Sequence, residues 1–250
     1  TYSGATTLNA GTLKAGSSTA FGTGSITESS NAVLDLNGQT MTSTGGLTLN
    51  GTGIGLNGAL INSSAIGATY AGLVTLGSAT TITGGSGTIA LTNTGTITGS
   101  GFALTLDGAA GGSIASIIGT TTTTPNANTT LTKAGAGTWT LSGANTYTGN
   151  TTISNGTLTI DGAGTLGSGT YAGNIVNSSA TSTFKYASSS AQTLSGVISG
   201  LGTLTKEINL SVLTLTGANT YTGTTNINAG TLTIGGSGSL GVVSGIATYA

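Results

Sequence analysis

The chain has 250 residues, of which 46 are Gly, one is Pro and none is Cys or His. Four Lys and five acidic residues are its only charges, 4% of the sequence, against about 25% in ordinary soluble domains. This composition excludes disulfides, imidazole and thiolate metal sites and most acid–base catalysis. The near-neutral balance with no Arg argues against a nucleic-acid surface, because phosphate neutralisation needs clustered Lys or Arg.

No segment of the sequence is apolar enough to span a membrane as a helix. Leaving Gly aside, no apolar run is longer than three residues, whereas a membrane-spanning helix needs about 18 or more. The sequence starts at Thr1 without an initiator Met or a basic-then-apolar signal segment. We therefore expect either a processed chain or a window of a longer protein.

The first predicted element is a repeat unit at residues 1–16, TYSGATTLNAGTLKAG. Looser units follow over about 25–130, for example LTLNG at 47–51 and ALTLDG at 103–108. In these units apolar residues alternate with Thr, and Gly or Asn ends each run, which is typical of short β-strands and turns. Gly is too frequent for α-helices to persist.

The segment TTTTTPNANTT at 120–130 contains the only Pro and has no inward-facing apolar residue. This composition predicts a loop that leaves the stack of strands. Loops carry recognition more often than scaffolds do. We therefore select Thr122, Pro125 and Asn126 as a candidate contact loop, with an O-glycosylated patch as the alternative.

Two longer copies of the first unit follow. LSGANTYTGNTTISNGTLTIDG at 141–162 and LTGANTYTGTTNINAGTLTIGG at 215–236 agree at about 16 of 22 positions. In every copy an apolar residue followed by Gly lies 19 residues after a Tyr: Phe21 after Tyr2, Leu166 after Tyr147, and Leu240 after Tyr221. The constant spacing indicates a shared geometry, not only a shared composition.

Apolar residues also recur at intervals near 20, as in Leu194, Leu213 and Leu232. This interval predicts a β-solenoid whose coils stack about 4.8 Å apart and bury columns of apolar side chains. We expect an all-β, right-handed parallel β-helix of roughly 10 to 13 coils, a rod on the order of 50 to 60 Å long. One continuous solenoid is predicted over 1–250, with strong repeats at 1–24 and 131–241, looser coils at 25–130 and the loop excursion at 120–130.

The repeat units resemble those of a known family. GTWTLSGANTYTGNTTISNGTLTIDG, its partner at 212–236 and SAQTLSGVISGLGTLTK at 190–206 are similar to the autotransporter-associated β-strand repeat. The resemblance is strong over about 131–241 and 1–24 and only compositional in between. That repeat occurs in passenger regions of bacterial autotransporters and in very large surface proteins of Gram-negative bacteria. The resemblance implies a secreted β-helix that serves as a stalk, adhesin or fibre, with no catalytic residues to transfer.

The repeat signature has two interpretations. Its residues are Tyr2, Gly4, Asn145, Tyr147, Gly149, Asn219, Tyr221 and Gly223. In the favoured one, each Tyr packs over a corner of the coil that Gly makes possible. In the other, the Tyr rings form exposed platforms for glycans.

The charged residues do not form a catalytic or metal-binding pattern in the sequence. The acidic residues are Glu28, Asp35, Asp107, Asp161 and Glu207. We expect turn and cap roles for them, and no metal or cofactor, since DGAGTLGSG at 161–169 does not recur as calcium-binding nonapeptides do. Lys133 and Lys206 occupy equivalent repeat positions and are interpreted as surface residues that aid solubility or protect strand edges, with Lys206 pairing with Glu207.

The leading functional hypothesis is a non-enzymatic, extracellular structural solenoid on a Gram-negative type of surface, acting as a stalk, an adhesin or a building block of a filament. Expected partners are further copies of the chain, end to end or side by side, or neighbouring repeats of a longer chain, with host-surface or glycan contact as a further option. An ice-binding Thr-rich solenoid is the alternative. A polysaccharide-active enzyme is a third hypothesis and requires distant carboxylates to converge in space.

Overall fold

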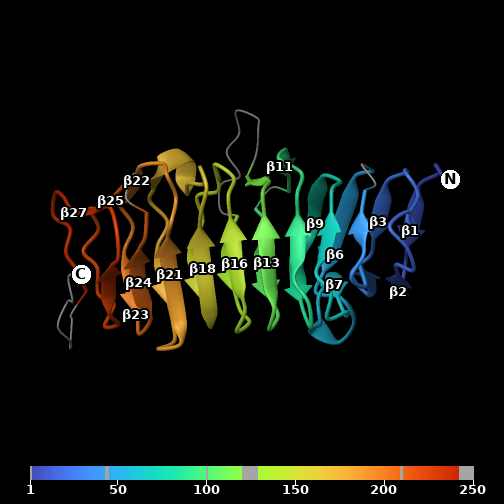
Figure 1. Cartoon of the computed structure of the whole chain (residues 1–250), viewed down its shortest axis with the longest axis horizontal. Coiled ribbons are helices and arrows are strands. Elements are labelled where there is room, and N and C mark those ends of the chain that lie inside the picture. The colour runs from blue at the N-terminus through green and yellow to red at the C-terminus, as the bar shows by residue number, and fades with distance from the viewer. Residues whose placement is uncertain (1, 43–44, 100, 120–128, 209–210, 242–250) are drawn as a thin grey trace.

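A computed structural model describes residues 2–42, 45–99, 101–119, 129–208 and 211–241. Over these residues the protein is an elongated solenoid of short strands (Figure 1). The proposed contact residues Thr122, Pro125 and Asn126 lie outside the described residues.

All strand pairings in the described part of the chain are parallel. No α-helix occurs there, and the two 3-10 turns are η1 (Ile54–Leu56) and η2 (Gly167–Gly169). None of the described helices is long and apolar enough to cross a membrane. The expected all-β, parallel architecture is thus confirmed.

Each coil has three faces, which the chain visits in the fixed order face 1, face 2, face 3. The strands of face 1 are β1 (Thr6–Leu8), β3 (Ile26–Glu28), β6 (Leu47–Gly51), the first half of β9 (Val74–Gly84), β11 (Thr96–Ile97), β14 (Ile117–Ile118), β19 (Thr170–Tyr171), β22 (Gln192–Leu194), β25 (Val212–Leu215) and β27 (Thr231–Ile234). The strands of face 2 are β2 (Gly11–Lys14), β4 (Ala32–Asp35), β7 (Leu60–Asn62), the second half of β9, β12 (Leu104–Asp107), β15 (Leu131–Lys133), β17 (Thr151–Ile153), β20 (Ile175–Asn177) and β23 (Ile198–Gly200). The strands of face 3 are β5 (Thr40–Met41), β8 (Ala68–Tyr70), β10 (Ile89–Leu91), β13 (Gly111–Ile114), β16 (Thr138–Leu141), β18 (Gly156–Ile160), β21 (Ser182–Tyr186), β24 (Thr203–Lys206) and β26 (Thr225–Ile227).

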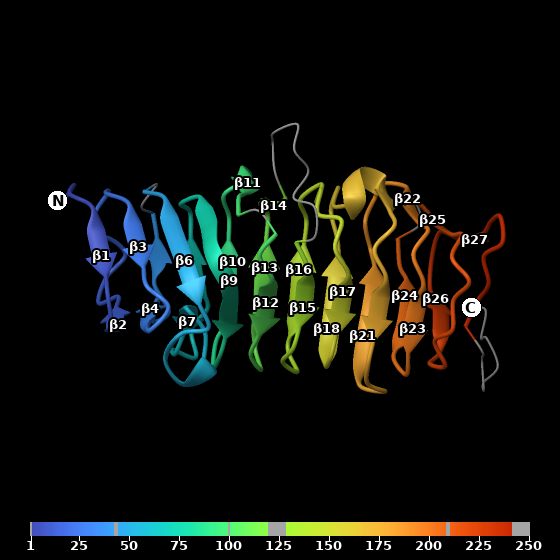
Figure 2. The same cartoon turned by 180° about the vertical axis from the view of Figure 1, so that it is seen from behind.

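The coils advance along the rod in a right-handed sense, with face 3 in front in Figure 1 and face 2 in front in the reverse view of Figure 2. The stack has about ten turns, at the lower end of the predicted range. Right-handed winding is the sense expected for parallel crossovers between twisted strands.

Columns of apolar side chains fill the interior. On face 3 the register stacks Trp139 on Leu158, Leu158 on Phe184 and Phe184 on Leu204, and all four side chains are buried. The flanking residues of these strands are mostly Thr and point outward, because successive side chains of a strand alternate between its two sides. The coils between these neighbours contain 19, 26 and 20 residues, so loops at the corners absorb the differences.

One predicted column has a different register. Leu213 stacks on Leu232 as expected from the interval of 19 residues. Leu194 stacks on Leu215, however, and the partner of Leu213 in that coil is Gln192. The prediction of a Leu194–Leu213 contact was wrong by two residues because the coil between them is longer than the spacing used to align them.

Glycine is required where coils approach each other closely. A Cβ atom on Gly149 would lie 2.3 Å from the Thr129 carbonyl oxygen, and one on Gly223 would lie 2.1 Å from that of Gly202. Neither glycine has a positive φ. The close contact of stacked backbones therefore explains these two signature glycines, rather than a left-handed turn.

Removing one whole coil should leave a folded, shorter rod. Residues 134–153 span one coil, since Lys133 and Ile153 are neighbours in the register of face 2. Their deletion should bring β15 against β20 and β13 against β18, and shorten the rod by about 4.8 Å. Small-angle X-ray scattering and circular dichroism measure the two effects.

Deletion of residues 134–143 is the matched control. It removes face 3 of that coil alone, so every following strand is placed on the wrong face and the β-sheet spectrum should be lost. Equal loss of structure in both deletions would contradict a modular solenoid.

Candidate functional site

The most regular polar feature of the molecule is the Asn of the repeat signature. Asn145 is buried; its Oδ1 accepts a hydrogen bond from Ile118 N (2.9 Å), and its Nδ2 donates to Gly143 O (2.8 Å) and Thr165 O (3.0 Å). The side chain therefore connects three successive coils. Asn219 repeats this arrangement with Ile198 N (2.8 Å) and Ser239 O (2.6 Å).

The signature Tyr side chains lie inside the coil. Tyr147 and Tyr221 are 0% and 1% exposed. Each hydroxyl pairs with the Thr four residues later, Thr151 at 2.9 Å and Thr225 at 2.6 Å. Burial raises the pKa of Tyr147 well above its ordinary value. Because both rings are enclosed, they offer no aromatic platform to a glycan.

The first copy of the signature is more open than the other two. Tyr2 is 56% exposed, and its hydroxyl donates to Ala5 O at 2.7 Å. Its ring lies against Gly4, where an added Cβ would be 3.1 Å from the Tyr2 hydroxyl oxygen.

The three copies lie in three different orientations around the rod. The strand after the signature Tyr is β1 on face 1 in the first copy, β17 on face 2 in the second and β26 on face 3 in the third. The signature residues are thus not aligned along one side of the molecule. They lie at corners on three different faces and do not form one continuous recognition stripe.

Lys133 and Lys206 are buried, so their interpretation as surface residues was wrong. Both side chains are 0% exposed. Lys133 Nζ donates to Gly135 O and to Asn155 O (3.1 Å), and Lys206 Nζ donates to Ile208 O (2.8 Å). Each ammonium group therefore satisfies the carbonyl two residues further on, where the chain turns a corner.

Strand alternation contained the signal for these buried lysines. In Leu-Thr-Lys, the Leu and the Lys occupy the two inward positions and the Thr points outward. Burial lowers the pKa of Lys133 to about 8, while the Asp107 carboxylate acts in the opposite direction. Burial also lowers the pKa of Lys206, whose Nζ lies 5.7 Å from the centre of the Tyr186 ring.

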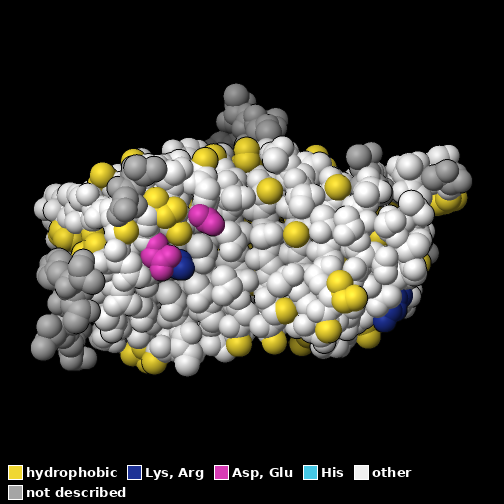
Figure 3. Space-filling view, viewed as in Figure 1, with side chains coloured by type: hydrophobic (Ala, Val, Ile, Leu, Met, Phe, Trp, Pro, Cys, Tyr) yellow, Lys and Arg dark blue, Asp and Glu magenta, His cyan; other side chains and the backbone are white. Residues whose placement is uncertain are grey.

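The surface has few charges, as the face in Figure 3 illustrates. Glu207 pairs with Lys185 at 2.7 Å and not with Lys206, which corrects the expected local pair. The hydrogen bond from Lys185 lowers the pKa of Glu207. Both side chains are about one-third exposed, so the pair contributes little to stability.

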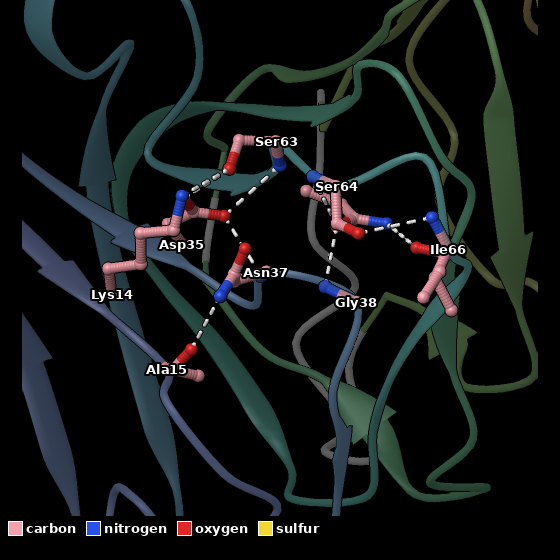
Figure 4. A network of polar contacts seen from close by, with 9 residues as sticks. Lys14, Ala15, Asp35, Asn37, Gly38, Ser63, Ser64 and Ile66 are labelled. Carbon is pink, nitrogen blue, oxygen red and sulfur yellow. Dashed lines mark hydrogen bonds and ion pairs between the residues drawn. The ribbon is translucent and has the colours of Figure 1, made fainter.

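A polar network closes the corners of the first coils on face 2. Asp35 Oδ2 accepts from Ser63 Oγ at 2.6 Å, and Lys14 Nζ lies 3.5 Å from Oδ2 and 3.1 Å from Ser63 Oγ (Figure 4). Asp35 Oδ1 also accepts from the backbone N of Asn37 and of Ser63. The hydroxyl proton of Ser63 is directed at a carboxylate that accepts three hydrogen bonds and pairs with the Lys14 ammonium group. This is the bonding of a structural bridge and not of an activated nucleophile.

Glu28 is the most unusual carboxyl group of the chain. It is fully buried at the end of β3 and lies in the wall of an open pocket of about 420 Å³. Oε2 accepts from Asn50 N at 2.7 Å, whereas Oε1 has no hydrogen-bonding partner. Burial raises the pKa of Glu28 to about 7, against the opposing effect of the Asn50 hydrogen bond. Its inward position in Ile-Thr-Glu follows the same alternation as Lys133.

These residues form no catalytic centre of the usual kinds. The described residues contain no group of three or more His, Cys, Asp or Glu side chains able to hold a metal ion. Asp107 and Asp161 each bind the backbone N of the following Gly, at 2.7 Å in both cases. Such contacts stabilise turns.

Replacing Asn145 by Ala should destabilise the fold by roughly 2–3 kcal/mol. The buried Ile118 N–H loses its acceptor, and the carbonyls of Gly143 and Thr165 each lose one donor while keeping a backbone N–H. Asn150→Ala is the matched control. Asn150 Oδ1 also binds a backbone N of the next coil, Asn174 N at 2.9 Å, but at an exposed turn, where the loss should be below about 1 kcal/mol. Urea unfolding measures both; equal losses would refute a special role of burial.

Lys133 should make stability rise with pH above pH 8. The folded pKa of about 8 is below the ordinary 10.5, so between these values the unfolded chain binds more protons than the folded one. Between pH 7.5 and 9.5 the wild type should gain about 2 kcal/mol more than Lys133→Met. Denaturant unfolding at both pH values tests this. Lys185→Met is the control and should retain the gain; a gain retained in Lys133→Met would contradict the assignment.

Comparison with known proteins identifies the repeat. The family model of the passenger-associated-transport repeat matches residues 1–15, 131–160 and 211–234. Each of these segments contains one copy of the signature, and the strands that follow the three signature tyrosines lie on three different faces of the solenoid. No curated protein and no solved structure matches the chain significantly. The predicted autotransporter-associated repeat is therefore confirmed in these three segments, which are passenger-associated-transport repeats built into a β-solenoid.

Proposed function

We propose that the chain is a non-enzymatic, extracellular structural module of a Gram-negative passenger, in which the solenoid acts as a stalk. The observation that carries this proposal is the uninterrupted stacking of coils from β1 to β27 around one apolar core. Backbone hydrogen bonds join every coil to its neighbours, so the rod is rigid along its length. The secreted location rests on the passenger repeat at three places in the chain.

The distribution of lysine supports a role outside the cell. Trypsin-like proteases cleave after Lys or Arg, and the chain has only four such residues. Lys133 and Lys206 are buried, and Lys185 is paired with Glu207. Lys14, with a side chain 53% exposed, is the most accessible. A surface module of this kind has few accessible cleavage sites for trypsin-like proteases, although it contains no disulfides.

The proposal includes stacking on a further coil. In the described part of the chain, β1 pairs only with β3, and β27 pairs only with β25. The free edges of these strands can accept another coil, from the same chain or from a second copy. A filament is one extension of this proposal, in which the stalk joins further copies of the chain. An adhesin is another, in which the stalk presents a neighbouring part of a longer chain.

Ice binding is the second candidate, because face 3 has a column of outward Thr residues. The column consists of Thr138, Thr157, Thr183 and Thr203, each of which is the register partner of the next. The adjacent column contains Thr140, Thr159 and Thr205, but Lys185 interrupts it and pairs with Glu207. This ion pair breaks the flat hydroxyl array that ordered water requires, so a stalk is favoured. Thermal hysteresis of the purified chain would favour ice binding instead.

The stalk proposal is tested on intact Gram-negative cells that produce the protein in its full-length context. Antibodies against the solenoid should label these cells without permeabilisation, and proteinase K added outside should remove the label. A tag at the far end of the passenger should move closer to the cell surface when whole coils, such as residues 134–153, are deleted. Labelling only after permeabilisation would contradict the location, and polysaccharide cleavage by the purified chain would contradict the non-enzymatic role.

A further inference from the structure

The pocket at Glu28 crosses three successive coils at the corner between faces 1 and 2. Glu28 ends β3, Asn50 lies in β6, and Ser78 lies in β9, and these strands are neighbours in the sheet. The complete lining consists of Thr27, Glu28, Ser29, Ser30, Asn50 and Ser78. Every one of these side chains ends in an oxygen-bearing group, and none is aromatic or aliphatic.

The carboxylate in this pocket lacks a counter-ion. The ion pairs of the described residues join Lys14 to Asp35 and Lys185 to Glu207. The neighbouring strands β1, β6 and β9 carry no titratable side chain. Glu28 Oε1 therefore has no protein donor and no cation, although burying an unpaired carboxylate is costly.

Hydrogen bonds hold the Ser78 and Asn50 side chains of the lining and leave other lining oxygens without a partner in the described chain. Ser78 Oγ accepts from Gly51 N at 2.9 Å, and Asn50 Nδ2 donates to Glu28 O at 2.6 Å, which turns the Asn50 side chain toward the Glu28 corner. Within the described chain, the hydroxyls of Ser29 and Ser30 and the Oδ1 of Asn50 have no hydrogen-bonding partner. The pocket thus combines one buried carboxylate with neutral oxygen donors from three coils.

We propose that this pocket binds a hard, oxygen-coordinated cation of the Ca²⁺ class, with Glu28 as its charged ligand. Ca²⁺ accepts six to eight oxygen ligands in flexible geometry, and water molecules fill the positions that the protein leaves open. Mg²⁺ fits less well because it requires near-ideal octahedral geometry and loses water reluctantly. A saccharide is disfavoured because the lining contains no aromatic side chain on which its C–H faces could stack.

One carboxylate and neutral oxygens make a weak site, in the range of about 10⁻⁴ to 10⁻³ M. Binding joins the strands β3, β6 and β9 across the corner, so the cation stabilises the coils that carry the looser repeats. The site lies outside the segments that match the passenger repeat. The proposal does not depend on the stalk function.

The test is thermal unfolding of the purified chain at pH 8 in EDTA, and then with CaCl₂ up to 10 mM at constant ionic strength. Ca²⁺ should raise the Tm of the wild type by roughly 3–6 °C, and MgCl₂ or NaCl should have a much smaller effect. Isothermal titration with CaCl₂ should show one site per chain.

Glu28→Gln should abolish both effects, while Glu207→Gln, the matched control at a surface ion pair, should retain them. Ser30→Ala should weaken Ca²⁺ binding several-fold without lowering the Tm in EDTA, because the Ser30 hydroxyl supports no contact of the fold. This variant keeps the proposal testable if Glu28→Gln does not fold. Absence of a Ca²⁺-specific shift in the wild type would show that only water occupies the pocket and would overturn the proposal. An equal shift in Glu28→Gln would also overturn it.

Discussion

The parallel hydrogen bonding of each coil to the next is the constraint on which the rest of this structure depends. It places every residue about 4.8 Å from its counterpart in the neighbouring coil. Side chains of similar chemical type therefore stack on one another along the rod. Large apolar residues gain from this repetition, as in the column from Trp139 to Leu204. Like charges would repel, which explains why uncharged Thr covers the surface. The backbones of neighbouring coils also lie so close at Gly149 and Gly223 that a Cβ atom would collide with a carbonyl oxygen, so only Gly fits at these two positions.

The corners between faces present the second physical problem, because there the backbone leaves the ladder and its polar groups lose their partners. Inward polar side chains solve it. Asn145 and Asn219 accept from and donate to backbone groups of adjacent coils, and Lys133 and Lys206 bind corner carbonyls. Repetition of the signature on three different faces shows that the sequence motif encodes a corner, wherever the corner lies around the rod.

The unusual chemistry of the protein lies in its less regular half. The Lys14–Asp35–Ser63 network and the Glu28 pocket both lie within the first four coils, where strands and loops vary most in length. Glu28 uses the same inward strand-end position as Lys133, but a carboxylate can only accept hydrogen bonds. It receives one, from Asn50, and keeps one oxygen without a partner. A corner that a lysine or asparagine closes internally is therefore left open to an external cation.

Periodicity in the sequence by itself determined the solenoid and the strand character of the repeats, because alternation and spacing act locally along the chain. Composition by itself determined the scarcity of catalytic groups. The tertiary structure alone decided which coils stack in which register, since partners are separated by coils of unequal length. This is why Leu194 meets Leu215 and not Leu213. It also decided the environment of each charge. Lys133 lies in the interior and Lys185 on the surface, and the pocket at Glu28 requires residues from three coils that no local pattern joins.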